Sequence, residues 1–345
     1  MTDIRYDALA LGDAMVDILS PATTDLLADE GMVHGQMRVM TSEAEAARLE
    51  ALMSHRNAVA GGSAANTMAG LAMLGGRAAF IGQVADDEMG DLFTRDLVAV
   101  GAAMPKPPQP GPPMTGRCLI FVTPDGERTM NTWRGASETL ALTKTDETEI
   151  AAAKTILLEA YLWDQPVPRI AMRRAIEIAR AAGRRIAFTL AAIRMVENNR
   201  HDLLALMADG AIDQLFANEE EVLALTRETT LNDAVAALRA LVPLSVVTRG
   251  RGGALSVTAD GVTEAASVDC LQLRDTTGAG DIFAAGYLAA EANGQDERSC
   301  LRLGAAAAAD VICAIGARPA PGLAARLTAG GFTGADRHGM TMPQK

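Results

Sequence analysis

The fold of this chain is indicated by one stretch, Asp275-Thr276-Thr277-Gly278-Ala279-Gly280-Asp281, which runs on into Ile282-Phe283-Ala284-Ala285-Gly286-Tyr287-Leu288. A strand-like run, 266–273, precedes it, and the small apolar residues after it are typical of a helix. Small residues at the turn let backbone N–H groups approach an anion, and the helix start adds unpaired N–H groups and its positive dipole end. The pattern therefore predicts an anion hole at Gly278, Ala279 and Gly280.

Asp281 lies at the mouth of this predicted anion hole. A carboxylate there can accept a proton from an incoming hydroxyl while the N–H groups stabilise charge on a transferred phosphoryl group. This arrangement indicates phosphoryl transfer to an alcohol. The alternative is an ordinary strand-to-helix turn capped by an aspartate. Two other phosphate motifs are excluded, because no G-x-x-x-x-G-K-[ST] occurs and Phe283 replaces the third glycine of a dinucleotide fingerprint.

The composition sets further bounds. With 345 residues, 49% of them hydrophobic, the chain is long enough for one large α/β domain. Its formal net charge of −12 disfavours nucleic acid or an anionic membrane as a partner. No run resembles a signal peptide or is apolar for long enough to span a bilayer, so a cytoplasmic location is expected. The cysteines, Cys118, Cys270, Cys300 and Cys313, lack paired or metal-binding spacing and are expected to be free thiols.

Two aspartates near the N-terminus are candidate binding residues. A strand is predicted from Tyr6 to Ile18, with Asp13 and Asp17 near its end. Side chains four apart on a strand point to the same face, where these carboxylates would accept hydrogen bonds from sugar hydroxyls. The alternative is a solvated strand end.

A glycine-rich run, Ala60-Gly61-Gly62-Ser63-Ala64-Ala65-Asn66-Thr67, leads into an apolar helix. Gly61 and Gly62 would let a ligand approach the backbone, and Asn66 offers both a donor and an acceptor. A tight strand–helix connection is the alternative. Further along, strands at 156–158, 185–190, 214–217 and 244–248 alternate with predicted helices, which indicates a parallel sheet with ligands at the carboxyl ends of its strands.

The stretch 275–288 resembles the C-terminal signature of the ribokinase (PfkB) carbohydrate kinase family, and the run from Ala60, with Gly75 and Gly82 after it, resembles the N-terminal signature. The resemblance implies a ribokinase-like three-layer α/β/α sandwich with a mostly parallel central sheet. Residues 1–332 would form a single kinase domain with a small β-sheet lid inserted at about 18–40 and 110–135. Such a lid would exclude water and protect ATP from hydrolysis. Residues 333–345 are expected to be a disordered tail.

The resemblance also implies ATP and Mg²⁺ as cofactors. Asn218 and Glu221 match an N-x-x-E motif that arranges magnesium-bound water, although an acidic run at a helix start is also ordinary capping. The segment matching T-x-G-x-x-G would lie beside ATP, through Thr248, Gly250 and Gly253, and Thr276 would join this ATP site.

A monovalent cation, K⁺, is implied near Asp275 and the loop 314–319. One departure from the family concerns Ala191, where many relatives carry an asparagine, so a phosphate or substrate contact is expected to be missing there.

Within the family the chain looks most like adenosine kinases. On that resemblance Asp17 would bind the ribose hydroxyls with Asp13 beside it, and Arg128 would reach the phosphates from the lid. The nucleoside would be held by Gly61, Gly62, Ser63 and Asn66. The aromatic residues Trp133, Tyr161 and Trp163 would stack on a purine, or else pack in the core.

The expected activity is ATP-dependent phosphorylation of the 5′-hydroxyl of adenosine, with Asp281 as general base, by a monomer or homodimer. One alternative is a PfkB-type kinase of ribose, fructose or a keto-deoxy sugar acid. Another is a nucleoside or sugar binder without turnover, which the intact Asp281 argues against because a pure binder has no use for a base.

Overall fold

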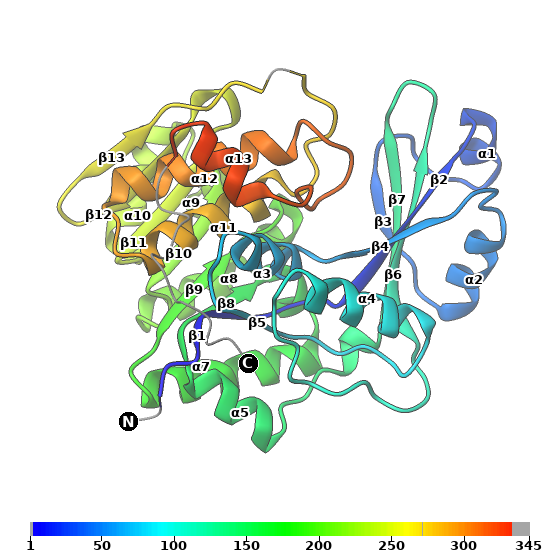
Figure 1. Cartoon of the computed structure of the whole chain (residues 1–345), viewed down its shortest axis with the longest axis horizontal. Coiled ribbons are helices and arrows are strands. Elements are labelled where there is room, and N and C mark those ends of the chain that lie inside the picture. Colours follow the sequence, from blue (N-terminus) through cyan, green and yellow to red (C-terminus); the bar gives the residue numbers. More distant parts are fainter. Residues whose placement is uncertain (1–2, 271, 333–345) are drawn as a thin grey trace, which may run out of the picture.

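Two β-sheets lie side by side in the computed structural model of the chain, one of eight strands and one of five (Figure 1). The structure describes residues 3–270 and 272–332, so the predicted tail, 333–345, lies outside the described residues. Within the described part, no helix has the length and apolar character needed to cross a membrane.

The large sheet is mostly parallel, as predicted. Its strands are, in order across the sheet, β13 (Val262–Ala265), β12 (Ala254–Thr258), β11 (Leu244–Thr248), β10 (Gln214–Asn218), β9 (Arg185–Thr189), β8 (Ala153–Glu159), β1 (Tyr6–Leu11) and β5 (Ala78–Ile81). Neighbours from β5 to β11 pair in parallel, whereas β12 and β13 pair antiparallel at one edge.

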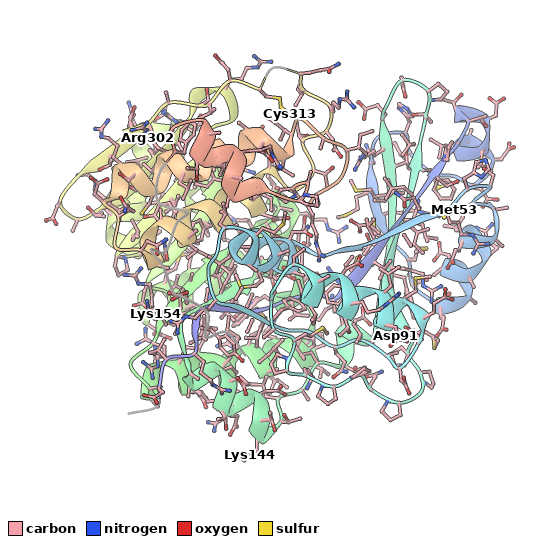
Figure 2. The ribbon with its side chains drawn as sticks, viewed as in Figure 1. Met53, Asp91, Lys144, Lys154, Arg302 and Cys313 are labelled. Atoms are coloured by element: carbon pink, nitrogen blue, oxygen red, sulfur yellow. A yellow bond between two sulfur atoms is a disulfide. The ribbon has the colours of Figure 1, made fainter. Side chains whose placement is uncertain are left out.

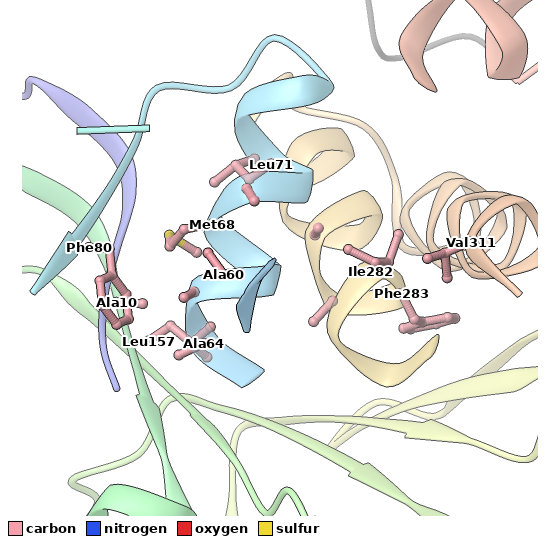
Figure 3. Packing of buried hydrophobic residues seen from close by; sticks show 14 of the residues in the cluster. Ala10, Ala60, Ala64, Met68, Leu71, Phe80, Leu157, Ile282, Phe283 and Val311 are labelled. Carbon is pink, nitrogen blue, oxygen red and sulfur yellow. The ribbon is translucent and has the colours of Figure 1, made fainter. Parts of the chain in front are cut away.

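Successive side chains of each strand point to opposite faces of the large sheet. Both faces are buried, each in its own core cluster. In β1, Ala8 and Ala10 join one core cluster, and Leu9 and Leu11 join the other. Helices α3 (Ser63–Met73), α4 (Glu88–Ala99), α11 (Ala279–Ala292), α12 (Glu297–Val311) and α13 (Leu323–Ala329) contribute to the first cluster. Figure 3 shows Met68 of α3 near strand residues Ala10 and Phe80.

The second cluster is completed by α5 (Lys144–Ala151), α6 (Ala160–Trp163), α7 (Pro166–Ala181), α8 (Ile193–Ala208), α9 (Glu219–Thr226) and α10 (Leu231–Leu241). Helices therefore cover both faces of the parallel sheet, and the predicted ribokinase-like three-layer α/β/α architecture is confirmed. In such a sheet, ligands bind outside the carboxyl ends of the strands.

The small sheet has the order β3 (Met37–Val39), β7 (Arg128–Gly135), β6 (Thr115–Val122), β2 (Met15–Pro21) and β4 (Asn57–Gly61). Helices α1 (Thr24–Asp29) and α2 (Glu43–Ala51) lie on its side away from the large sheet (Figure 1). Val16, Leu119 and Phe121 share the first core cluster with Leu49 of α2. The segments 18–40 and 110–135 both contribute strands, and β4 is an additional strand that the sequence pattern did not reveal.

Two predicted strands are wrong. The run Tyr6 to Ile18 forms two strands, β1 and β2, because the chain leaves the large sheet at 12–14 and enters the small one. Gly12 fits this crossing closely, since a Cβ there would lie 2.6 Å from the Cβ of Ala64. The strand predicted at 266–273 is not formed by the described residues there. Instead, β13 ends at Ala265, and the loop that follows it borders a pocket.

The expectation of four free thiols is corrected as well. The structure joins Cys270 to Cys313, with Cα atoms 6.2 Å apart, whereas Cys118 and Cys300 are free and buried. The loop after β13 brings Cys270 to the end of α12, where Figure 2 labels Cys313. A separation of 43 residues carries no recognisable spacing, which is why the sequence did not indicate this pair.

Candidate active site

The turn before α11 has the backbone that its glycines predict. Gly278 has a φ of +76°, and a Cβ there would lie 2.4 Å from the carbonyl oxygen of Ala317, so only glycine fits. The N–H of Ala279 donates to the carbonyl of Thr276 at 3.2 Å. Among the described residues, no hydrogen bond engages the N–H groups of Gly278 and Gly280. Two of the three predicted anion-hole donors are therefore available to a ligand.

Asp281, in the first turn of α11, is half-buried and held by α3. Ser63 Oγ donates to Asp281 Oδ1 at 2.6 Å, and Asn66 Nδ2 donates to Asp281 Oδ2 at 3.1 Å. The two helices, which lie side by side in Figure 3, pack closely, since a Cβ on Gly70 of α3 would lie 2.7 Å from the Cβ of Ala285 in α11. Burial raises the pKa of Asp281, and the two hydrogen bonds oppose this shift. Ser63 and Asn66, predicted to contact the nucleoside, therefore hold the predicted base in this structure.

Asp17 lies near Asp281 but on β2 of the small sheet. Burial raises the pKa of Asp17 to about 7, against the opposing charges of Arg318 and Arg128. Gly61 on the neighbouring strand makes room for it, since a Cβ there would lie 2.5 Å from Asp17 Oδ2. The glycine thus admits a carboxylate of the protein itself, rather than the ligand that the sequence suggested.

Asp13 does not share the strand of Asp17, so the prediction that the two point to one face is wrong. It is buried in the crossing between the sheets, where Arg134 Nε lies 3.4 Å from Asp13 Oδ2. A Cβ on Gly62, whose φ is +87°, would lie 2.2 Å from the carbonyl oxygen of Asp13. Asp13 Oδ1 is buried without a hydrogen-bond partner among the described residues, so this carboxylate keeps one acceptor for a ligand or water.

Glu159, at the carboxyl end of β8, was missed by the sequence analysis, as was Arg134. The fully buried Glu159 accepts from the N–H of Asp13 at 2.6 Å and from the N–H of Ala64 at 2.7 Å. Burial, with the nearby charge of Asp13, raises the pKa of Glu159 to about 8. This carboxyl joins the crossing between the sheets to the start of α3, and so fixes where Ser63 lies.

Arg128 of β7 connects the small sheet to the turn 275–280 before α11, which is called the glycine-rich turn from here on. Its Nη2 lies 2.5 Å from Asp275 Oδ2, and its Nη1 donates to Thr277 Oγ1 at 3.2 Å. Asp275 also accepts from the N–H groups of Thr277 at 3.0 Å and Gly316 at 2.7 Å. The ion pair thus connects the two sheets beside the predicted phosphate site. That the small sheet acts as a lid stays a prediction.

We expect Arg128→Gln to loosen this connection. A hydrogen bond to a charged group contributes about 1.5–3 kcal/mol, so amide exchange in the turns 275–278 and 126–130 should become roughly ten- to a hundredfold faster. Hydrogen exchange followed by mass spectrometry measures this. Arg48→Gln is the matched control, because its partner Glu30 lies on the small-sheet side. Equal exchange in both variants and the wild type would show that Arg128 does not hold the sheets together.

The predicted cation ligands are engaged with protein groups. Both oxygens of Asp275 already accept from protein donors, so the structure gives no support to a monovalent cation there. Glu221 and Asn218 form a reciprocal capping box at the start of α9, with three hydrogen bonds of 2.9 Å. Burial raises the pKa of Glu221 to about 7. Over residues 3–270 and 272–332, no cluster of three or more His, Cys, Asp or Glu side chains could bind a metal ion.

A pocket of about 410 Å³ adjoins the glycine-rich turn, in the size range of small-molecule sites. Four predicted ATP residues line it, namely Thr248, Gly250, Gly253 and Thr276, together with Ala279 and Gly280 of the anion hole. Side chains of α11 and α12 make its apolar wall, among them Phe283 and Ala308. Asn218 and Arg128 do not line this pocket. Its position lets a nucleotide base occupy the apolar part while phosphates reach the turn.

The aromatic residues divide between core and site. Trp163 is fully buried, with its ring edge-on to Phe188 and the Arg173 guanidinium 4.9 Å from the ring centre. Its prediction as a purine-stacking residue is therefore wrong, because no face of the ring is open to a ligand. Tyr161 is half-buried, and its hydroxyl donates to the carbonyl of Ala191 at 3.3 Å. Burial and the nearby charge of Asp281 raise its pKa, so Tyr161 does lie near the site.

Comparisons with known proteins agree with this geometry. The sequence matches the profile of the pfkB family carbohydrate kinases over residues 32–322. Among solved structures it is similar to the adenosine kinase from Sinorhizobium meliloti, with 39% identity, a TM-score of 0.88, and coverage of 94% of this chain and 99% of that one. A probable sugar kinase protein from Rhizobium etli CFN 42 has 36% identity and a TM-score of 0.89, with 95% and 99% covered. Among curated proteins, the ATP-dependent ribose-1-phosphate kinase of Halopiger xanaduensis is 29% identical over 282 residues, which cover 79% of this chain and 86% of that protein.

Proposed function

This chain belongs to the pfkB family of carbohydrate kinases and is an ATP-dependent phosphotransferase, and we propose that its acceptor is adenosine, phosphorylated on the 5′-hydroxyl. The likeness to the adenosine kinase of Sinorhizobium meliloti supports this acceptor. A sugar such as ribose or fructose is the alternative, favoured by the likeness to a probable sugar kinase and to a ribose-1-phosphate kinase.

The observation that carries the proposal is the character of the small-sheet face on which Asp17 lies. Asp17 pairs in register with Cys118 of β6, and Cys118 pairs with Thr132 of β7, so these side chains share a face. Along the same face, a separate apolar cluster is formed by Met15, Leu19, Cys118, Ile120, Val122 and Met130. An apolar wall beside a carboxylate suits a nucleobase attached to a ribose, whereas burying the hydroxyls of a free sugar against that wall would cost free energy for lack of hydrogen-bond partners.

The positions of the residues support the following roles in the proposed reaction. Asp17 would accept hydrogen bonds from the ribose hydroxyls, which places the 5′-hydroxyl toward Asp281. Asp281 takes the proton of that hydroxyl as its oxygen bonds to the terminal phosphorus of ATP and the bond to ADP breaks. The N–H groups of Gly278 and Gly280 stabilise the charge that develops on the transferred group.

Magnesium, when bound with ATP, would neutralise charge on the phosphates. The Asn218–Glu221 pair is engaged in capping, so any contribution from it would pass through magnesium-bound water, which this ion readily retains.

We expect ADP release in a coupled assay to be fastest with adenosine across a panel of nucleosides, ribose, fructose, keto-deoxy sugar acids and ribose 1-phosphate. Met130→Ala should raise KM for adenosine about tenfold, because burying a methionine side chain contributes roughly 1.5–3 kcal/mol, and should leave any activity on ribose unchanged. Val98→Ala is the control, since Val98 is an exposed apolar residue of α4 outside the small sheet. Faster turnover of a sugar, or equal effects of Met130→Ala on both acceptors, would reject adenosine.

A further inference from the structure

Arg318 lies in the loop after α12 and is the start of a chain of two hydrogen bonds that ends on Asp281. Arg318 Nε donates to Asn66 Oδ1 at 3.0 Å, and Asn66 Nδ2 donates to Asp281 Oδ2 at 3.1 Å. The chain joins residues from three separate parts of the sequence. Arg318 belongs to the loop 314–319, which was predicted to bind a cation, but neither that prediction nor the roles assigned above use its side chain.

The surroundings of Arg318 are unusual for an arginine. Its Nη2 is buried without a hydrogen-bond partner among the described residues. Burial lowers the pKa of its guanidinium to about 10, and this shift is opposed by the charges of Asp96, Asp17 and Asp281. A partly desolvated cation costs stability when it keeps a single side-chain hydrogen bond, as Arg318 does within residues 3–270 and 272–332. A role in the reaction is a reason for tolerating that cost.

We propose that Arg318 is a positioning residue for phosphoryl transfer, which orients the Asn66 amide so that this amide holds the Asp281 carboxylate. The proposal deepens the function proposed above and rests on Asp281 being its base.

The chemistry of the three groups supports this role. An asparagine amide has a donor end and an acceptor end, and either end can face a neighbour. A guanidinium has only donors, so it requires the Asn66 oxygen to face Arg318. The NH₂ end must then face Asp281, whose carboxylate only accepts when ionised. Arg318 therefore selects the amide orientation that matches the ionised base.

The charge of Arg318 acts in the same direction. Four other groups near Asp281 are acids whose pKa its charge raises: Asp17 on β2, Glu159 on β8, Glu221 on α9 and the hydroxyl of Tyr161 on α6. Arg318 is the cation that opposes the upward shift of the Asp281 pKa. Without it, Asp281 should take up its proton at a higher pH.

The test uses Arg318→Gln and Arg318→Lys in the full chain, with the acceptor that gives the highest turnover. Loss of a supporting interaction typically costs about 10–100-fold in activity, so Arg318→Gln should lower kcat by that factor and leave KM for ATP unchanged. The acidic limb of its kcat–pH profile should move to higher pH. Arg318→Lys keeps the charge but not the planar fork, so its kcat should fall while its acidic limb stays in place. Arg302→Gln is the control, because Arg302 is an exposed arginine of α12 whose guanidinium lies 5.9 Å from the centre of the Phe332 ring.

A double-mutant comparison decides whether Arg318 acts through Asn66. If it does, Arg318→Gln combined with Asn66→Ala should lose little more activity than Asn66→Ala alone. Multiplied losses in the double variant, or an unmoved acidic limb in Arg318→Gln, would overturn the proposal. Thermal unfolding of each variant identifies one that fails to fold, and Arg318→Lys then carries the test. Wild-type turnover of a sugar instead of adenosine would reject the acceptor and leave this test intact.

Discussion

Asp281→Asn is expected to lower kcat by about 10²–10⁴-fold, because removal of a general base typically costs that much. ATP binding should be unchanged, since the pocket that adjoins the glycine-rich turn is lined by other residues. A coupled assay of ADP release gives kcat, and calorimetric titration with a non-hydrolysable ATP analogue gives the affinity.

Asparagine suits this test because its amide fits the existing hydrogen bonds. Its oxygen can accept from Asn66, and its NH₂ group can donate to the Ser63 hydroxyl, which accepts as well as donates. The matched control is Asp233→Asn, an exposed aspartate in the first turn of α10, which should lose at most about 0.3–1 kcal/mol of helix stabilisation. If turnover of Asp281→Asn stays within a few-fold of the wild type, Asp281 is not the base and the turn is an ordinary capped helix start.

Much of the large sheet, with the helices that cover it, could be predicted from the sequence. The strands of the parallel sheet are buried on both faces and read as apolar runs between helices, and this pattern is local. The turn at Gly278 is predictable from its own residues, because its positive φ requires glycine. In the folded chain the contact with Ala317 requires glycine as well. Asp281 was found through the same motif.

The supporting shell of the site could not be predicted in this way. Glu159 binds the N–H groups of Asp13 and Ala64, and Arg318 binds Asn66 across 252 positions of sequence. Each of these residues is ordinary in its own segment, and they come together only because β8 and the loop after α12 both pack against α3. Trp163 shows the converse error, since a large aromatic residue after a strand is as well suited to the core as to a ligand.

Burial raises the pKa of several carboxyl groups near the site, among them Asp17 and Glu221, to about 7, and Glu159, to about 8. A carboxyl whose folded pKa exceeds its unfolded one holds its proton in the folded state after the unfolded chain has released it. The free energy of unfolding therefore falls as pH rises from about 4 toward 7 or 8. This loss of unfolding free energy accompanies the placement of acidic groups around the substrate site.

The variant Asp17→Asn separates the loss of stability caused by this carboxyl from its contribution to acceptor binding. In the wild type, KM for adenosine should rise as pH falls below about 7, because Asp17, which we propose to bind the ribose hydroxyls, loses its charge when protonated. The variant should show a KM raised by about 10–100-fold at pH 8, since a charged hydrogen-bond partner contributes about 1.5–3 kcal/mol, and its KM should respond less to pH. Steady-state kinetics between about pH 6 and about 8.5, on both sides of the Asp17 pKa of about 7, measures both.

Stability should change in the opposite direction. Asp17→Asn removes a carboxyl that loses its proton only near pH 7 when folded, so its unfolding free energy should fall less steeply between about pH 4 and 7 than that of the wild type. Glu159 and Glu221 contribute alike to both proteins and cancel in the comparison. Urea denaturation at pH 5.5 and 8, two values chosen on either side of about 7, gives the difference, with the exposed Asp25→Asn of α1 as control. A variant that is less stable than the wild type at pH 8, or that binds adenosine equally well, would show that Asp17 supports the small sheet rather than the acceptor.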